Sequence, residues 1–364
     1  MLRSSWIDTC GRFALLFCAW KALCVLRKWS HVPKPLEPTR LDLLKDHLPD
    51  PLRSYFVTSH GYHLYQRKWL PRHDQHPRGV VFILHGLGEH GGRYEYMGCT
   101  LAKAGYAVFM VDHQGHGLSD GQRMYAHNIA HLAEDFLEFV QHVLRLPGAT
   151  NNATKSAHPV NDDLDAHASV DWKALPRFLF GHSMGGIVTL NLIELSKVQG
   201  VEWNGVVLSS PAVYCFPPAQ YPIVVTVLSA LGRIFPLFSL PLLDFYQISH
   251  ERQVVRRLLR DPIGMKVVDH GSTLGLGGSL VRLSLKYAHQ ETAFTNGDVT
   301  APMFMLHGEK DQITIVNGTV KFYTRYAGKD KVIKLVPNAL HELFHSEHRD
   351  ELLDEVIQWL DNHR

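Results

Sequence analysis

The chain has 364 residues, of which 45% are hydrophobic and 20% are charged, and this is enough material for one large buried core plus an inserted piece. Its 37 Lys and Arg residues nearly balance its 35 Asp and Glu residues, and the resulting net charge of +2 argues against a nucleic-acid partner. Three of the five cysteines lie in the first 24 residues, so a disulfide framework is excluded and a reducing compartment is indicated.

An apolar segment precedes the rest of the chain. Residues 13–20 are apolar, Lys21 interrupts the run, and Arg27 and Lys28 close it. The uninterrupted run is too short to span a bilayer comfortably, and no small-residue cleavage site is obvious. We expect residues 1–50 to comprise an apolar membrane anchor in the first thirty residues, interfacial or spanning, and a stiff proline-rich linker after it. A cleaved signal peptide and a helix packed on the protein's own surface are the alternatives.

Apolar runs alternate with helical patterns after this segment. Residues 54–58 and 62–69 flank the turn signal Ser59-His60-Gly61 and predict a hairpin. The later apolar runs are unbroken, which indicates strands covered on both faces, as in a parallel sheet. Alternation of such strands with helices predicts a doubly wound α/β core. The strands are expected at 80–84, 107–111, 178–180, 206–208, 303–306 and 332–336, and the helices at 94–104, 129–146, 186–198, 316–326 and 352–360.

Two stretches interrupt this alternation. Residues 147–175 are polar and are expected to form a mobile surface loop without a catalytic role. Residues 212–300 lie between two strands that should be neighbours, so we expect an inserted cap that divides the core into residues 51–211 and 301–364. Residues 221–243 of this cap are mostly apolar, but their prolines argue against a spanning helix. A basic cluster follows, which fits a solvated helix face or attraction to an anionic membrane. It consists of Arg252, Arg256, Arg257 and Arg260.

The pentapeptide Gly181-His182-Ser183-Met184-Gly185 stands between a predicted strand and a predicted helix. It has the G-x-S-x-G pattern, in which a sharp turn lifts the serine hydroxyl clear of the backbone. Glycines suit the outer positions because side chains there would collide with neighbouring backbone. Ser183 is therefore the candidate nucleophile.

A serine hydroxyl becomes reactive only when a base removes its proton and an acid orients that base. In this kind of fold the acid and then the histidine follow the serine along the chain. Asp311 follows the strand predicted at 303–306, and His341 follows the strand predicted at 332–336. Both positions lie at the carboxyl ends of strands, where the sites of open α/β sheets are found. We assign Asp311 as the acid and His341 as the base.

The oxyanion site is expected to use two backbone amides. One belongs to Met184, directly after the nucleophile, and the other to Leu87, in the loop after the first central strand. Gly86 and Gly88 flank Leu87 and let the chain approach the substrate closely. This chemistry requires no metal and no organic cofactor.

Five motifs together resemble those of the monoacylglycerol lipases and, more broadly, the serine lipase and lysophospholipase branch of the α/β-hydrolases. The resemblance covers residues 55–362 and is most specific in the first three motifs. It implies an α/β-hydrolase fold, with a mostly parallel sheet and an inserted helical cap. It also implies a triad of Ser183, Asp311 and His341. The motifs are residues 85–90 (HGLGEH), 112–119 (DHQGHGLS), 181–185 (GHSMG) and 308–311 (GEKD), together with His341.

The resemblance further implies a substrate and a location. Monoacylglycerols would be cleaved to a fatty acid and glycerol through an acyl-enzyme on Ser183. The cap would line an acyl-chain tunnel and contact the membrane. We therefore expect a lipid substrate, either a monoacylglycerol or a lysophospholipid, and a membrane surface as partners. The expected location is the cytoplasmic face of an internal or plasma membrane.

Several alternatives remain at this point. A lysophospholipase or another carboxylesterase would use the same machinery. Residues 341–345 also spell H-E-x-x-H, the zinc-peptidase motif, but that motif requires a helix and Pro337 lies just upstream. A catalytically silent binding protein is the third alternative. A dehalogenase or an epoxide hydrolase is disfavoured, because those enzymes place an aspartate where Ser183 stands.

Overall fold

The computed structural model describes residues 55–146, 167, 169–214, 221–240, 245–264 and 272–364. The expected anchor and linker, residues 1–50, lie outside the described residues. Among the helices that the structure describes, none is both long enough and apolar enough to cross a membrane.

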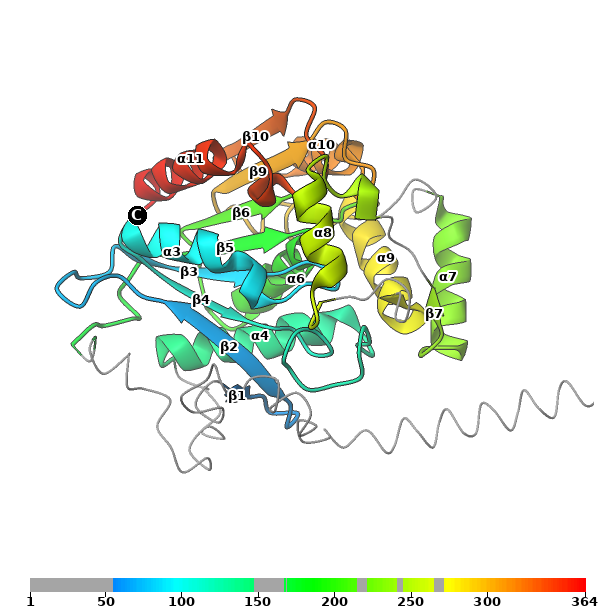
Figure 1. Cartoon of the computed structure of the whole chain (residues 1–364), viewed down its shortest axis with the longest axis horizontal. Helices are drawn as coiled ribbons and strands as arrows, with labels where there is room; N and C mark the ends of the chain where they lie inside the picture. The colour runs from blue at the N-terminus through cyan, green and yellow to red at the C-terminus, as the bar shows by residue number, and fades with distance from the viewer. Residues whose placement is uncertain (1–54, 147–166, 168, 215–220, 241–244, 265–271) are drawn as a thin grey trace, which may run out of the picture.

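An eight-stranded sheet forms the centre of the molecule, with the strand order β1-β2-β4-β3-β5-β6-β9-β10 (Figure 1). The first two strands pair antiparallel, β2 also runs antiparallel to β4, and all further pairs are parallel. The strands are β1 (Tyr55–Val57), β2 (His63–Trp69), β3 (Gly79–Leu84), β4 (Tyr106–Val111), β5 (Arg177–His182), β6 (Gly205–Ser209), β9 (Met303–Gly308) and β10 (Lys331–Val336).

The predicted strands are confirmed within a few residues, including the hairpin around Ser59-His60-Gly61. One expectation is corrected. The run at 332–336 was expected to be covered on both faces, but β10 is an edge strand and Val332 is 43% exposed. An edge strand has a partner on one side only, so apolar residues in it need not be buried.

Helices cover both faces of the sheet. Side chains of α3 (Glu95–Lys103) and α11 (Arg349–Asn362) pack with one set of alternating strand residues, such as Val81 and Ile83. Side chains of α4, α6 and α10 pack with the opposite set, such as Val80 and Phe82. The helices of this second layer are α4 (Ile129–Leu144), α6 (Met184–Val198) and α10 (Val316–Arg325). The predicted α/β fold is thereby confirmed.

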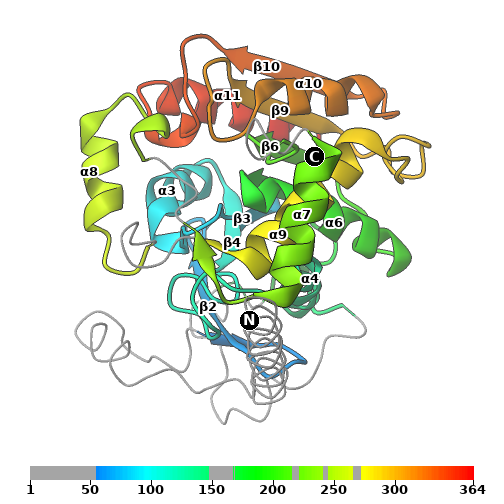
Figure 2. The same ribbon diagram turned by 90° about the vertical axis from the view of Figure 1, so that its right-hand side faces the viewer.

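The segment between β6 and β9 contains helices that play different parts. In Figure 2, which looks onto the carboxyl ends of the strands, α7 and α8 stand apart from each other above the sheet. By contrast, α9 is part of the main core, where Leu276, Leu280 and Tyr287 are buried. The described elements are α7 (Pro222–Ile234), β7 (Ser239–Leu240), η5 (Phe245–Gln247), α8 (Arg252–Arg260), β8 (Ser272–Thr273) and α9 (Leu274–His289).

The stretch predicted as a loop, 147–175, falls largely outside the described residues. Its end is described, and here the expectation of a surface loop is wrong. Val170, Trp172 and Leu175 are buried in the main core. The Trp172 ring packs edge-on against Phe109 of β4, with ring centroids 5.8 Å apart. A large aromatic ring buries enough apolar area to fix the chain that leads into β5.

The helix α4 shows how the sequence dictates this layer. Asn128 begins the helix, because its side-chain oxygen accepts a hydrogen bond from the Ala130 amide at 3.2 Å. Apolar residues then recur at intervals of three and four, so that one face turns to the sheet. At the centre of this face Phe136 meets the rings of Phe82 and Phe139 at centroid distances of 6.4 and 5.7 Å.

We predict that Phe136→Ala lowers the free energy of unfolding by about 3–5 kcal/mol, because it leaves a cavity among aromatic rings. Phe136 is 0% exposed, and Val198→Ala, at a residue that is 86% exposed, is the matched control and should change stability by less than about 0.5 kcal/mol. Urea unfolding measures both values. Equal effects of the two substitutions would contradict the packing described here.

Candidate active site

A sharp turn places Ser183 between β5 and α6. Its backbone has φ 54° and ψ −118°, a strained conformation for a residue other than glycine. The turn is held by its surroundings, since the Ser183 amide donates to the Ser209 carbonyl at 3.0 Å and the Ala212 amide donates to the Ser183 carbonyl at 3.0 Å. A Cβ atom on Gly185 would collide with the backbone carbonyls of Leu84 and His85. The glycine is therefore required by close packing, as the sequence pattern predicts.

The acid and the base meet at the carboxyl ends of β9 and β10. Asp311 Oδ2 lies 2.7 Å from Nδ1 of His341. The Asp311 carboxylate is held in place by hydrogen bonds from the Ile313 amide at 2.8 Å, the Thr314 amide at 3.0 Å and the Thr314 hydroxyl at 2.9 Å. The Ser210 hydroxyl donates to the carbonyl of His341 at 3.0 Å. The two residues are thus fixed in position before any substrate arrives.

Burial and charge act in opposite directions on this pair. Burial alone would raise the pKa of Asp311, but His341 and His307 hold that pKa well below its usual range. Burial alone would lower the pKa of His341, but the carboxylate of Asp311, together with those of Glu342 and Glu89, offsets this effect and the net pKa is raised. Such a carboxylate favours the cationic form of the ring and holds its tautomer, which a base that accepts a proton from serine requires.

One pocket contains the remaining parts of the predicted site. Ser183 and His341 both line it, and so do Leu87 and Met184, the predicted sources of the oxyanion amides. The ring of His182, next to Ser183 in sequence, lies with its centroid 4.9 Å from that of His341. The inserted segment contributes apolar side chains to the pocket lining, namely Leu228, Leu274, Leu280 and Val281.

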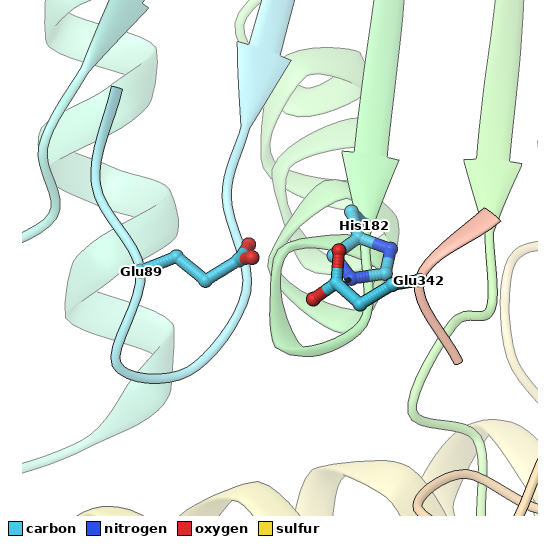
Figure 3. A group of neighbouring side chains, drawn as sticks. All are labelled: Glu89, His182 and Glu342. Atoms are coloured by element: carbon cyan, nitrogen blue, oxygen red, sulfur yellow. Dashed lines mark ion pairs between the residues drawn. The ribbon is translucent and has the colours of Figure 1, made fainter. Parts of the chain in front are cut away.

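The pocket is also lined by charged residues that the sequence reasoning missed. Glu89, His182 and Glu342 offer ligand atoms that all lie within 4.8 Å of one another, and all three side chains are buried (Figure 3). These residue types could hold a metal ion. Arg93, however, lies against both carboxylates, at 3.0 Å from Glu89 and 3.1 Å from Glu342. The guanidinium already supplies the positive charge, so this group does not fit a metal.

The H-E-x-x-H motif does not form the helical site that a zinc peptidase requires. Residues 341–345 include only a short 3-10 turn, η6 (Leu343–His345). His341 is bound to Asp311, whereas Nδ1 of His345 lies 2.7 Å from Glu342. The two rings therefore have separate partners rather than a common point of convergence.

A serine on a strained strand–helix turn, a buried acid–histidine pair and a shared pocket at the carboxyl edge of a parallel sheet define a serine hydrolase of the α/β-hydrolase type. The sequence profile of the family described as serine aminopeptidase, S33, matches residues 75–158 and 147–348. The chain belongs to this family. The predicted family resemblance is likewise confirmed by relatives that carry the name monoacylglycerol lipase.

Three of these similar proteins indicate the range of the family. Monoacylglycerol lipase of Mycolicibacterium smegmatis is 31% identical over 296 residues, which cover 81% of this chain and 91% of the relative. Caffeoylshikimate esterase of Arabidopsis thaliana is 28% identical and covers 85% of each chain. The crystal structure of Paleococcus ferrophilus monoacylglycerol lipase is 29% identical, with a TM-score of 0.62, over 83% of this chain and 99% of that chain.

We predict that Asp311→Asn lowers the pKa of His341, because it removes the charge that offsets the effect of burial. The titration of the His341 ring, followed by NMR, should move to lower pH. Asp330→Asn removes a carboxylate that is 55% exposed and pairs with His363, so this control should leave the titration unchanged. An identical His341 titration in all three proteins would show that the pair does not interact as described.

Proposed function

We propose that the protein is a monoacylglycerol lipase, which cleaves the ester of a monoacylglycerol to a fatty acid and glycerol. The observation that carries the proposal is the arrangement of one pocket. The strained serine and the histidine of the buried acid–histidine pair line it, together with both apolar and charged side chains. An ester with one acyl chain and one polar alcohol likewise combines an apolar part and a polar part.

In the proposed mechanism His341 takes the proton of the Ser183 hydroxyl as its oxygen attacks the ester carbonyl. Asp311 holds the imidazole tautomer and favours the imidazolium that forms. The backbone amides of Leu87 and Met184 stabilise the tetrahedral oxyanion, an effect of about 3 kcal/mol for each donor. His341 then gives the proton to the departing glycerol oxygen. In the second half, His341 activates a water molecule that releases the fatty acid from Ser183.

The relatives support a lipid ester but leave a second candidate. Proteins named monoacylglycerol or monoglyceride lipase recur among them, and the apolar residues that line the pocket suit an acyl chain. Caffeoylshikimate esterase is also a relative, so a different carboxylic ester is the main competitor. The deciding experiment is turnover of mono-, di- and triacylglycerols, lysophospholipids and caffeoyl esters by the purified protein. Preference for any class other than monoacylglycerols would overturn the substrate assignment.

We predict that Ser183→Ala lowers turnover by several orders of magnitude and abolishes covalent labelling by a fluorophosphonate, while the protein stays folded. Ser196→Ala is the matched control, because Ser196 is a buried serine on α6, the helix that follows Ser183, and its hydroxyl donates to the Leu192 carbonyl. It should label like the parent protein. Comparable labelling of Ser183→Ala would end the assignment of the nucleophile.

We also propose that the protein works at a membrane surface, on the cytoplasmic face of an internal or plasma membrane. Large apolar side chains are exposed on α7 and just around it, namely Tyr221, Ile223, Val227, Leu231 and Phe238, at 36–70%. A contiguous exposed apolar surface is typical of contact with lipid or protein. The arginines at 252, 256, 257 and 260 are exposed on α8, which adds attraction to anionic lipid. The expected anchor in residues 1–50 would act in the same direction.

We predict that the double substitution Ile223→Ser and Val227→Ser lowers activity several-fold on monoacylglycerol embedded in anionic vesicles, because less apolar area can enter the lipid. Hydrolysis of a water-soluble short-chain ester should not change, since neither residue lines the pocket. Val198→Ser, at an exposed position on α6, serves as the control. Equal loss on both substrates would indicate damage to the site instead of a role at the lipid surface.

A further inference from the structure

Arg93 pairs with Glu89 in the loop after β3 and with Glu342 in the loop after β10. The sheet does not connect these two loops directly. Its Nε lies 3.0 Å from Glu89 Oε1, and a terminal nitrogen lies 3.1 Å from Glu342 Oε1. The three side chains are 11%, 7% and 5% exposed, respectively. In Figure 3 the carboxylate of Glu89, on the loop after β3, points toward Glu342, and His182 lies beside Glu342.

Each carboxylate has a second oxygen that fixes its own loop. Glu89 Oε2 accepts a hydrogen bond from the Gly86 amide at 2.8 Å and another from the Tyr94 hydroxyl at 2.7 Å. Gly86 directly precedes Leu87, the proposed oxyanion donor. The side chain of Glu89 therefore holds the backbone that must point an amide at the reacting oxygen.

His345 contacts both Glu342 and the backbone of Arg93. Nδ1 of His345 lies 2.7 Å from Glu342 Oε2, and its Nε2 lies 2.8 Å from the carbonyl oxygen of Arg93. Both ring nitrogens face an acceptor, so only the imidazolium satisfies both. Two carboxylates, one guanidinium and one imidazolium then give a formally neutral group. We call Glu89, Arg93, Glu342 and His345 the clasp.

We propose that Glu342 is a positioning residue, which acts through Arg93 and Glu89 to set the distance between the histidine base and the oxyanion amides. The inference rests on the proposed serine esterase mechanism, in which His341 and Leu87 act on the same substrate carbonyl. Glu342 directly follows His341 in sequence, so its position fixes that of the base.

The topology explains why a side-chain connection is needed. In the sheet, β5, β6 and β9 lie between β3, which leads to the oxyanion loop, and β10, which leads to His341. No ladder of backbone hydrogen bonds joins β3 to β10 directly. A displacement of about 1 Å in a reacting group can cost about a hundredfold in rate. Buried ion pairs contribute little net stability and are better suited to specifying one arrangement.

Glu342 also acts on the charge of the base. The charged or titratable groups that face His341 are Asp311 from the loop after β9, Glu342 from its own loop, Glu89 from the loop after β3 and His182 from the end of β5. Burial lowers the pKa of His341, whereas Asp311, Glu342 and Glu89 raise it, and the net pKa is raised. His341 must be neutral to accept a proton, so losing one negative charge moves the acidic limb of kcat/KM to lower pH.

The test is Glu342→Gln, which keeps the shape and one acceptor but removes the charge. We expect kcat to fall about ten- to hundredfold with KM nearly unchanged, and the acidic limb of kcat/KM to move to lower pH. Glu347→Gln is the matched control, because Glu347 is 83% exposed and outside the clasp. A Glu342→Gln enzyme with the kinetics and pH profile of the parent protein overturns the proposal. A rise in KM alone would instead make Glu342 a substrate contact and would equally overturn it.

A second variant separates the effect of side-chain length from the effect of charge. Glu342→Asp retains the carboxylate but shortens the side chain by one methylene, so it should lower kcat while the acidic limb stays near that of the parent. Full activity in this variant contradicts a role in positioning, even if Glu342→Gln fails to fold. Fluorophosphonate labelling of the parent protein distinguishes failure of the two proposals. An unlabelled Ser183 ends the serine mechanism, whereas normal labelling with unaffected Glu342 variants ends only the clasp.

Discussion

The backbone turn at Ser183 is the constraint on which the rest of the site depends. A positive φ at a residue with a side chain is unfavourable by about 1–3 kcal/mol and persists only where the surroundings fix it. Here Gly185 packs directly on the carbonyl end of β3, and the serine amide is bound to the carbonyl end of β6. Three neighbouring strands are thus held together at one point. The pocket opens above that point because the loops after these strands must diverge around the turn.

Two separate groups of buried charge surround the turn. Asp311 and His341 form the first, which would carry the proton in the proposed mechanism. Glu89, Arg93, Glu342 and His345 form the second, whose charges balance within the group. The carboxylates of the second group also raise the pKa of His341 in the first. All of these side chains except His345 are buried or nearly so, and their charges therefore interact more strongly than they would at the surface.

The fold, and the position of the candidate residues at one edge of the sheet, could be predicted from sequence for a physical reason. Strands buried on both faces are unbroken apolar runs, and Ser183 and Asp311 each follow such a run within a few residues. His341 follows the largely apolar edge strand β10. Arg93 and Glu342 could not be found in this way, because they are distant in sequence and each resembles an ordinary surface residue. Only the folded chain brings them together. The signal that was present, Glu89 within HGLGEH and Glu342 next to His341, becomes meaningful once both positions are known to face the same pocket.

Composition also misled the prediction at Trp172. The polar stretch around it suggested a surface loop, but Trp172 is buried at its end together with two aliphatic residues, Val170 and Leu175. Polarity averaged over a long stretch conceals the few apolar residues within it that are buried. The edge strand β10 shows the opposite error, in which an apolar run looks more buried than it is.

The helices of the inserted segment between β6 and β9 differ in how far they are packed into the main core. Its last helix, α9, contributes Leu276 and Tyr287 to the main core, whereas α7 rests on α9 and presents much of its surface outward. The outer helix can therefore be exchanged or reshaped without opening the core, but α9 cannot. In evolution and in engineering, new specificities for the acyl chain should arise through substitutions in α7, while α9 stays constant.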